Sequence, residues 1–310
     1  MTSSDKLKIA IIGSGNIGTD LMIKVMRSKH LVCTLFAGRN FNSAGMKRAS
    51  QLGVPISDRG IEAIIADPSI CDMVFDATSA QAHIGHWATL EKLGKTVIDM
   101  TPAKLGEFCI PAINAQDCIR DGMVGGTAAG NINMITCGGQ SSIPIAAAIG
   151  QVHQNIEYVE VASSIASRSA GPATRANLDE YIETTEEALQ RFSGARRAKA
   201  ILILNPANPP IDMQTTIYAK IDNPDLDAIR ASVEAMVEKL KTYVPGYSLV
   251  IPPTLEAGRV ITTIKVMGAG DYLPQYAGNL DIINCAAIAM AEMLAEARLA
   301  KAHTKERKHG

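Results

Sequence analysis

The sequence is poor in aromatic residues, which make up 4% of its 310 residues and include a single tryptophan. Hydrophobic residues still reach 47%, so the apolar mass is aliphatic, a composition that suits helices packed on a buried sheet. With 20% charged residues, this is the composition of an ordinary globular protein and excludes a disordered chain. The length suffices for one large or two ordinary domains whose core needs no metal or disulfide for stability.

An excess of charge is also absent, because 30 Lys and Arg residues face 31 Asp and Glu residues for a net charge of −1. No global field attracts nucleic acid or an anionic membrane, so we expect neither as a partner. No apolar run reaches the roughly 18 residues that span a bilayer. The first apolar run ends at a glycine motif and lacks the features of a signal peptide, so we expect a cytoplasmic protein.

The six cysteines are scattered without a C-x-x-C pair, which predicts neither a zinc site nor a disulfide framework. No metal-binding spacing such as H-E-x-x-H and no Ser-His-Asp order is present, so we expect no metal. Cys33, Cys71 and Cys285 lie in apolar stretches and are expected to be core residues. His83 and His153 fall on helical stretches and are expected to be structural.

In the first half, short and almost fully apolar runs alternate with helical stretches. This alternation predicts an α/β fold, a Rossmann-type doubly wound parallel sheet with both faces covered. We predict strands at 6–12, 31–37, 73–78 and 95–100, a weaker strand at 123–129, and helices at 17–28, 44–52 and 82–93.

After about residue 138 the strands alternate apolar and polar residues, as strands with one solvated face do. This predicts a second α+β domain with a mostly antiparallel sheet. We expect strands at 158–169, 198–206, 215–221 and 260–267, and helices at 175–192, 225–243 and 280–302. The expected domains are a dinucleotide-binding domain (1–137) on which a helix at 279–302 packs back, a catalytic and dimerisation domain (138–278), and a basic tail (303–310).

The motif G-x-G-x-x-G follows the first predicted strand directly and opens the first helix. In this context Gly13 allows the tight turn, Gly15 lets the backbone approach a pyrophosphate, and Gly18 lets the helix pack closely on the strand. The helix N-terminus then offers N–H groups to the phosphates. The alternative is a glycine turn without a ligand. The candidate cofactor contacts in this loop are Gly13, Ser14, Gly15, Asn16 and Ile17.

Arg39 follows the end of the second predicted strand, where an NAD-selective fold usually has a carboxylate for the ribose 2′-hydroxyl. A guanidinium would instead pair with a 2′-phosphate, so Arg39 favours NADP or the use of both cofactors. The alternative is that Arg39 is a surface residue and NAD binds through backbone contacts. At the end of a further strand, Thr78 and Ser79 are candidates for the nicotinamide-ribose pocket, or caps of the following helix.

Cys137 follows an apolar run and precedes two glycines and a helical segment. A thiol at a helix N-terminus has its thiolate stabilised by the dipole, so we expect a lowered pKa and a nucleophilic role. We expect the backbone N–H groups near Gly138 and Gly139 to hold an oxyanion. The segment from Ser167 to Asn177 joins a strand to a helix with small residues that let a ligand come close.

Several long segments together resemble one family, the bacterial acylating acetaldehyde dehydrogenases of aromatic meta-cleavage pathways. The resemblance covers residues 9 to about 283, almost the whole chain. It is found in the segments IAIIGSGNIGTDLMIKV, VFDATSA, NINMITCGGQSSIP, SRSAGPATRANLDEY, ILNPANPP, VPGY and DYLPQYAGNLDI.

The resemblance implies a Rossmann domain, a smaller domain with the dimer contacts, and conversion of acetaldehyde, NAD and coenzyme A to acetyl-CoA. It also implies a homodimer and a 4-hydroxy-2-oxovalerate aldolase as a partner. The family's acyl-thioester nucleophile falls on Cys137. Besides the residues from Ser14 to Ile17, the cofactor contacts fall on Ser169, Ala170, Gly171, Pro172, Ala173, Thr174, Arg175, Ala176, Asn177 and Asn279.

The chain departs from the family at three places. Arg39 stands where the family usually has an Asp. Thr215 aligns with an Asp thought to act as the base, and Asp212 is the nearest carboxylate. The segment SLVIPPTLEAGR is shorter than its counterpart. Two other readings remain: a related semialdehyde dehydrogenase with another acyl acceptor, and a non-catalytic NAD(P)-binding regulator, against which Cys137 argues because a sensor needs no nucleophile.

Overall fold

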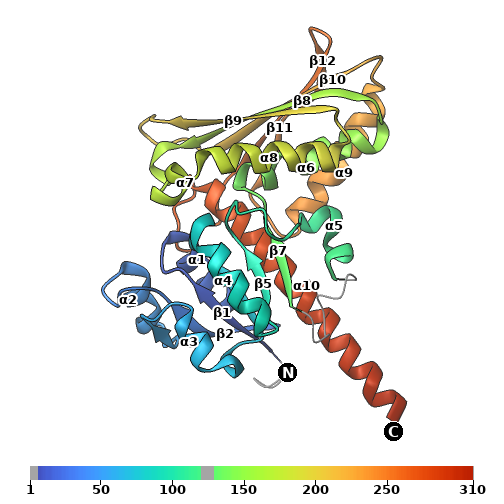
Figure 1. The fold of residues 1–310 in the computed structure, drawn as a ribbon. Coiled ribbons are helices and arrows are strands. Elements are labelled where there is room, and N and C mark those ends of the chain that lie inside the picture. The colour runs from blue at the N-terminus through green and yellow to red at the C-terminus, as the bar shows by residue number, and fades with distance from the viewer. Residues whose placement is uncertain (1–5, 120–128, 310) are drawn as a thin grey trace. The chain divides into compact units, whose positions relative to one another are not determined.

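The computed structural model describes residues 6–119 and 129–309 and divides the chain into two compact units. The first unit contains the described residues up to Met134 and those from Ala287 onward, and the second is Ile135–Ala286. The last helix, α10 (Gly278–His309), contributes to both units (Figure 1). It continues beyond residue 302, where we predicted its end, through most of the segment predicted as a tail.

The first unit is built on a seven-stranded sheet with the order β3-β2-β1-β4-β5-β7-β6, in which every neighbouring pair is parallel. The parallel, doubly wound sheet is therefore confirmed, and four of its strands lie within two residues of their predicted bounds. The weak strand predicted at 123–129 falls outside the described residues except for its last position. The strands are β1 (Leu7–Ile12), β2 (Leu31–Ala37), β3 (Ile56–Ser57), β4 (Met73–Asp76), β5 (Thr96–Asp99), β6 (Glu107–Phe108) and β7 (Gly130–Asn133).

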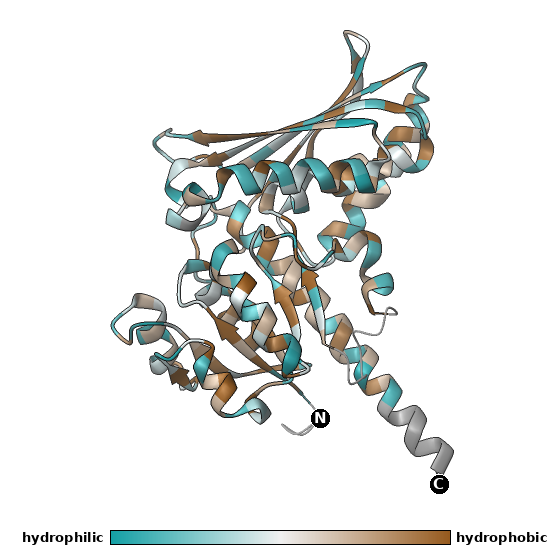
Figure 2. Cartoon of the chain, viewed as in Figure 1, coloured by the Kyte–Doolittle hydropathy of each residue, from teal (hydrophilic) through white to brown (hydrophobic). Residues whose placement is uncertain are grey.

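The helices of the first unit pack on this sheet because its strands are apolar on both faces (Figure 2). Leu35, Val74 and Val97 from three strands form one core cluster with Leu90 of α4. In α10, Met290 Sδ lies 3.5 Å from Cys109 Sγ, within the same unit. The helices are α1 (Asn16–Arg27), α2 (Ala44–Gln51), α3 (Glu62–Ala66), η2 (Pro68–Ile70), α4 (Ala80–Lys92) and α5 (Pro111–Cys118).

The second unit contains a five-stranded sheet with the order β11-β12-β10-β8-β9. Its pairs are antiparallel except for β8 with β9, so the mostly antiparallel sheet is confirmed. Its strands are β8 (Ile156–Ala166), β9 (Arg197–Asn205), β10 (Met213–Ile221), β11 (Tyr247–Glu256) and β12 (Arg259–Val266).

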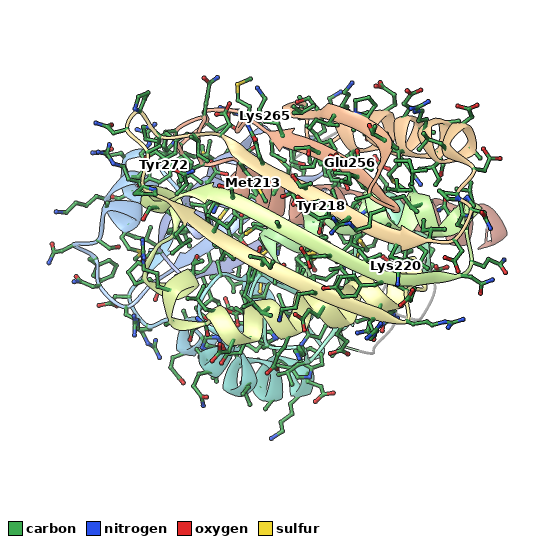
Figure 3. All side chains as sticks on the ribbon, turned by 90° about the horizontal axis from the view of Figure 1, so that it is seen from above. Met213, Tyr218, Lys220, Glu256, Lys265 and Tyr272 are labelled. Carbon is green, nitrogen blue, oxygen red and sulfur yellow. The ribbon has the colours of Figure 1, made fainter. Side chains whose placement is uncertain are left out.

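The helices α6, α8 and α9 cover one face of this sheet (Figure 1). Along β10, residues that point to the helices, such as Ile217, are buried, whereas Tyr218 and Lys220 alternate to the other face. Figure 3 looks down on that other face, where no helix of the described residues crosses the strands. The helices are α6 (Cys137–Val152), η4 (Ser167–Ser169), α7 (Pro172–Ala176), α8 (Leu178–Ser193) and α9 (Leu226–Lys241).

Two elements differ from the prediction. The helix expected at 175–192 is two helices, α7 and α8, which meet at Asn177. The edge strand β11 was not predicted, because Pro252 and Pro253 interrupt its pattern; an edge strand tolerates proline, which cannot donate to a neighbour. The short segment before β12 is a tight hairpin, turned by Ala257 and Gly258 at φ of 47° and 72°.

Candidate active site

The glycine loop between β1 and α1 has the geometry of a phosphate-binding turn. Gly13 has a φ of 113°, and a Cβ there would overlap the backbone of Ala77. A Cβ at Gly18 would overlap the carbonyl of Gly13, so the helix packs on the turn through bare backbone. At Gly15 an added Cβ meets nothing within 4 Å, and α1 begins at Asn16 without a side-chain cap. An open approach to an uncapped helix N-terminus suits a pyrophosphate.

The loop after β2 lies against the glycine loop. A Cβ at Gly38 would overlap the Ser14 hydroxyl, and Ser14 Oγ lies 3.1 Å from Ser43 Oγ. Ser43 in turn caps α2 by accepting from the Met46 N–H at 3.4 Å. Arg39 follows Gly38 directly and is exposed, so it stands at the carboxyl end of β2, where a doubly wound fold binds its ligand.

Thr78 and Ser79 follow β4 and have different partners. Thr78 donates its hydroxyl proton to Asp76 Oδ1 at 2.5 Å. Ser79 caps α4 by accepting from the Ala82 N–H at 3.3 Å, which is the capping role weighed for this residue.

Asp76, at the end of β4, belongs to a buried charge network that sequence reasoning missed. Its Oδ2 lies 2.9 Å from His83 Nδ1 and 2.8 Å from His86 Nδ1. On the other side of the ring, His83 Nε2 lies 3.3 Å from Asp99 Oδ2 and 3.0 Å from Asn131 Nδ2. The spacing of two histidines after a strand-terminal Asp is the only signal that the sequence offered.

The network shifts the pKa values of its members. Burial works against the charged forms, but hydrogen bonds from His83 and His86 hold the pKa of Asp76 well below its usual range. Burial raises the pKa of Asp99 to about 6. For His83, burial is outweighed by the hydrogen bond to Asp76 and the charge of Asp99, so its pKa is raised. The imidazolium of His83 is thereby favoured between two carboxyl groups.

In the second unit, Cys137 is the first residue of α6 and is half-buried. Thr136 caps the helix, and its Oγ1 accepts from the Gly139 N–H at 2.8 Å. The Gly139 N–H is therefore occupied, and the expectation that it holds an oxyanion is wrong. The N–H groups of Cys137 and Gly138 instead face the sulfur. Two residues earlier, Ile135 has a φ of 62°, a strained conformation for a β-branched residue.

The expected lowering of the Cys137 pKa is also wrong. Burial raises the pKa of the thiol to about 11, although the Tyr181 hydroxyl and the Gly138 N–H lower it. The helix N-terminus is present as predicted, but the enclosure of the sulfur by its neighbours outweighs it. The surroundings of the sulfur thus favour the thiol over the thiolate at neutral pH. Tyr181 is the fourth residue of α8 and is 7% exposed. The sequence analysis did not identify it as a candidate site residue.

Thr215, on the helix-covered face of β10, is fully buried among hydroxyl groups. Its Oγ1 lies 3.1 Å from Ser141 Oγ and 3.0 Å from Ser163 Oγ. Asp212, the carboxylate nearest in sequence, forms an ion pair with Lys265 at 3.7 Å. Thr215, which the resemblance sets against a carboxylate of the family, thus belongs to a network of hydroxyl groups.

The remaining cofactor candidates also lie in the second unit. Ser169 is buried and donates to the Ala166 carbonyl at 2.8 Å, while Arg175 Nε donates to the Ala170 carbonyl at 3.0 Å, so these side chains brace the segment itself. Asn279 is fully buried, and neither its amide nitrogen nor its amide oxygen finds a hydrogen-bond partner among the described residues. Because buried polar groups are almost always hydrogen-bonded, this amide indicates a place where a polar ligand binds.

Among the described residues, no group of three or more His, Cys, Asp and Glu side chains is arranged to hold a metal ion. No described helix combines the length and the hydropathy needed to cross a bilayer. None of the six cysteines, all of which the structure describes, forms a disulfide.

The fold matches solved semialdehyde dehydrogenases. Aspartate semialdehyde dehydrogenase with NADP from Candida albicans covers 92% of this chain and 99% of its own at a TM-score of 0.64 and 12% identity. Aspartate semialdehyde dehydrogenase II complexed with ASA, from Vibrio cholerae, gives a TM-score of 0.61 at 13% identity, over 94% of this chain and 99% of its own. The family model "Semialdehyde dehydrogenase, NAD binding domain" matches residues 8–117.

The fold and the glycine loop define an NAD-binding oxidoreductase of the semialdehyde dehydrogenase type. A second family model, "Prokaryotic acetaldehyde dehydrogenase, dimerisation", matches residues 137–274. The acetaldehyde dehydrogenase of Pectobacterium atrosepticum is 73% identical over 296 residues, 96% of this chain and 98% of that protein. That of Carboxydothermus hydrogenoformans is 47% identical over 99% of this chain and 100% of its own length. The chain belongs to the acetaldehyde dehydrogenase family.

Proposed function

We propose that the chain oxidises acetaldehyde, or a similar short aldehyde, to acyl-CoA and uses Cys137 as the acyl carrier. The single observation that carries the proposal is the placement of this thiol at the N-terminus of α6, with two backbone N–H groups facing the sulfur. The 73% identity to a named acetaldehyde dehydrogenase supports the choice of aldehyde. The family membership supports coenzyme A as the acceptor.

The glycine loop, Arg39 and Asn279 suit the binding of a nicotinamide dinucleotide. The open glycine loop and the α1 N-terminus would hold its pyrophosphate, and Arg39 stands where a 2′-phosphate would lie. The unsatisfied amide of Asn279 and the segment 169–177 are the further candidates for contacts with the cofactor. When bound, the cofactor supplies the acceptor for a hydride.

Cys137 carries the covalent chemistry. The Cys137 thiol loses its proton to solvent. The thiolate then adds to the carbonyl carbon, so a sulfur–carbon bond forms and the π pair moves to oxygen. The backbone N–H of Cys137, which faces the sulfur, is the donor that we place at this charge, since the Gly138 N–H already has the sulfur and the Tyr181 phenol oxygen as acceptors. Loss of hydride from the former carbonyl carbon leaves a thioester on Cys137. The thiol of coenzyme A then loses its proton to solvent and attacks the thioester, and the sulfur of Cys137 leaves with its electron pair.

A turnover assay with acetaldehyde, NAD and coenzyme A tests the proposal directly. We expect acetyl-CoA and NADH to form in equal amounts. Product analysis without coenzyme A, and with phosphate in its place, separates this activity from the one that the semialdehyde dehydrogenase domain would also allow, oxidation to an acid or an acyl phosphate. Equal turnover without coenzyme A would contradict the proposal.

We also propose a homodimer formed through the open face of the second sheet. The matching family model is named for dimerisation, and the residues that it matches, 137–274, include all five strands of this sheet. On that face, Ile201 and Ile203 of the edge strand β9 are exposed, and β8 separates them from Tyr218 of β10, which Figure 3 labels. A sheet face with apolar residues and no helix above it suits a second copy of the chain. As a finer proposal, the enzyme acts in aromatic meta-cleavage, where an aldolase would supply the aldehyde.

A further inference from the structure

The Tyr181 phenol is an ionisable group in contact with the Cys137 sulfur. It lies in the first turn of α8, is 7% exposed, and directs its hydroxyl to the N-terminus of α6. The hydroxyl hydrogen-bonds to the Cys137 sulfur, and the Gly138 N–H hydrogen-bonds to the phenol oxygen. The Tyr181 hydroxyl therefore lies between the Cys137 sulfur and the Gly138 N–H at the start of α6, and it is hydrogen-bonded to both.

Gly138 makes this contact sterically feasible. A Cβ at position 138 would overlap the Tyr181 hydroxyl oxygen and crowd the ring carbon that bears it. By contrast, the glycine at 139 is set by packing, since a Cβ there would press on Ile135 and on the capping Thr136. A side chain is therefore excluded at the two positions by different neighbours, and only at Gly138 is that neighbour the Tyr181 phenol.

The phenol keeps its proton and so acts as a donor. Burial and the neighbouring thiol raise the pKa of Tyr181 well above its usual range. A hydrogen bond donated to a charged acceptor is stronger than one to a neutral acceptor, so the contact favours the thiolate over the thiol. Because burial opposes the thiolate, such a donor matters more here than at an exposed site.

We propose that Tyr181 is a catalytic hydrogen-bond donor that stabilises the Cys137 thiolate, before it adds to the aldehyde and again when it leaves the thioester. In the first step the sulfur pair forms the bond to carbon, and in the second the same bond breaks and the pair returns to sulfur. Tyr181 gives up no proton in either step. This inference rests on the proposed role of Cys137.

The neighbouring hydroxyls do not share this task. Thr215 Oγ1 is engaged by Ser141 and Ser163 at 3.1 Å and 3.0 Å, and Ser141 and Ser142 both donate to the Gly138 carbonyl, at 2.9 Å and 2.7 Å. These bonds satisfy hydroxyls within the network, whereas the Tyr181 hydroxyl is the side-chain donor at the sulfur.

The test is the rate at which iodoacetamide alkylates Cys137, followed on the Cys137 peptide across a pH series without cofactor or substrate. We expect Tyr181→Phe to raise the thiol pKa by about one unit, which slows alkylation about tenfold at any pH below it. Tyr247→Phe is the matched control: it removes a buried phenol that donates to the Ser141 carbonyl of the same helix at 2.7 Å. Alkylation of Tyr181→Phe at the parental rate would overturn the inference.

A double-mutant cycle with Gly138→Ala adds a second test. Gly138→Ala alone should displace the hydroxyl and slow alkylation, but should cost less in the Tyr181→Phe background, because the atom it displaces is gone. Additive effects would contradict the contact. If Cys137→Ser abolishes acyl-CoA formation while Tyr181→Phe leaves the alkylation profile unchanged, this inference fails and the proposed function stands.

Discussion

His83 lies between two carboxyl groups, with its Nδ1 2.9 Å from Asp76 Oδ2 and its ring fully buried at the carboxyl ends of β4 and β5. The sheet brings these residues together because Asp76 and Asp99 occupy paired positions of neighbouring parallel strands. A buried carboxylate without a cationic partner is costly, so His83 stabilises the first unit where its imidazole is protonated.

We therefore predict that His83→Gln lowers the free energy of unfolding by about 3 kcal/mol at pH 6. The pKa of His83 is raised in the folded state from an ordinary 6.5, so its contribution is complete below 6.5 and is lost as the pH rises through the folded pKa. The difference between parent and variant should narrow from pH 6 to pH 9 in urea titrations. Measuring above pH 6 limits the contribution of Asp99, whose pKa is about 6.

The control is His153→Gln, which removes a histidine whose Nε2 accepts from the Asp225 N–H at 2.8 Å in the second unit. A difference for His83→Gln that stays constant over the pH range would mean that the ring contributes by packing and not by charge.

For Cys137→Ser we predict loss of acyl-CoA formation while the cofactor still binds. Serine has a similar shape, but its hydroxyl is a far weaker nucleophile, and the described surroundings of the sulfur offer it donors and no base. Cys285→Ser is the matched control, since Cys285 is also half-buried and its sulfur contacts Asp281 at 3.6 Å. Retention of more than about a tenth of the parental activity would show that the thiol is not the acyl carrier.

Arg39 should give the enzyme an unusual tolerance of NADP. A charge-assisted contact to the 2′-phosphate is worth roughly 1.5–3 kcal/mol, or about one to two decades in affinity, and Arg39→Asp should reverse the preference towards NAD. The measurement is the ratio of the two dissociation constants in parent and variant. Arg196→Asp makes the same change of charge on an exposed residue of the second unit. An unaltered ratio in Arg39→Asp would place the guanidinium outside the ribose site.

The sequence predicted the parts of this protein that depend on local pattern. Continuous apolar runs indicated the parallel sheet, and the glycine spacing indicated the turn that Gly13 and Gly18 form. It did not predict the contacts between residues that are distant in the sequence, because these depend on how the elements pack. Tyr181 contacts Cys137 although the two lie 44 positions apart in the sequence, separated by α6, β8, η4 and α7, and no local pattern encodes such a contact. For the same reason the dipole argument gave the wrong sign for the thiol pKa, since enclosure by distant residues dominates it.

A charge on the open sheet face should break the proposed homodimer. Ile203 is 46% exposed in the single chain, so a partner copy could bury it at no cost to the fold. We predict that Ile203→Arg weakens dimerisation by about 2–4 kcal/mol, because the symmetric interface would contain two copies of the new charge. Sedimentation at micromolar concentration measures this. Ile84→Arg, at an exposed isoleucine of α4, is the control and should leave the parental oligomer intact.

We predict finally that an aldolase binds this enzyme weakly or not at all. Direct transfer of a volatile aldehyde between two enzymes needs a specific interface, which buries roughly 1,200–2,000 Å² in total. The shortened segment before β12 is here a tight hairpin between β11 and β12, with no loop left to contribute to such a surface. Loss of one anchoring cluster costs about 2–4 kcal/mol, enough to make a stable complex transient. Co-purification with an aldolase from the same gene neighbourhood, followed by sizing at micromolar concentration, decides the matter: a stoichiometric complex that survives dilution would show that the hairpin is remote from the interface.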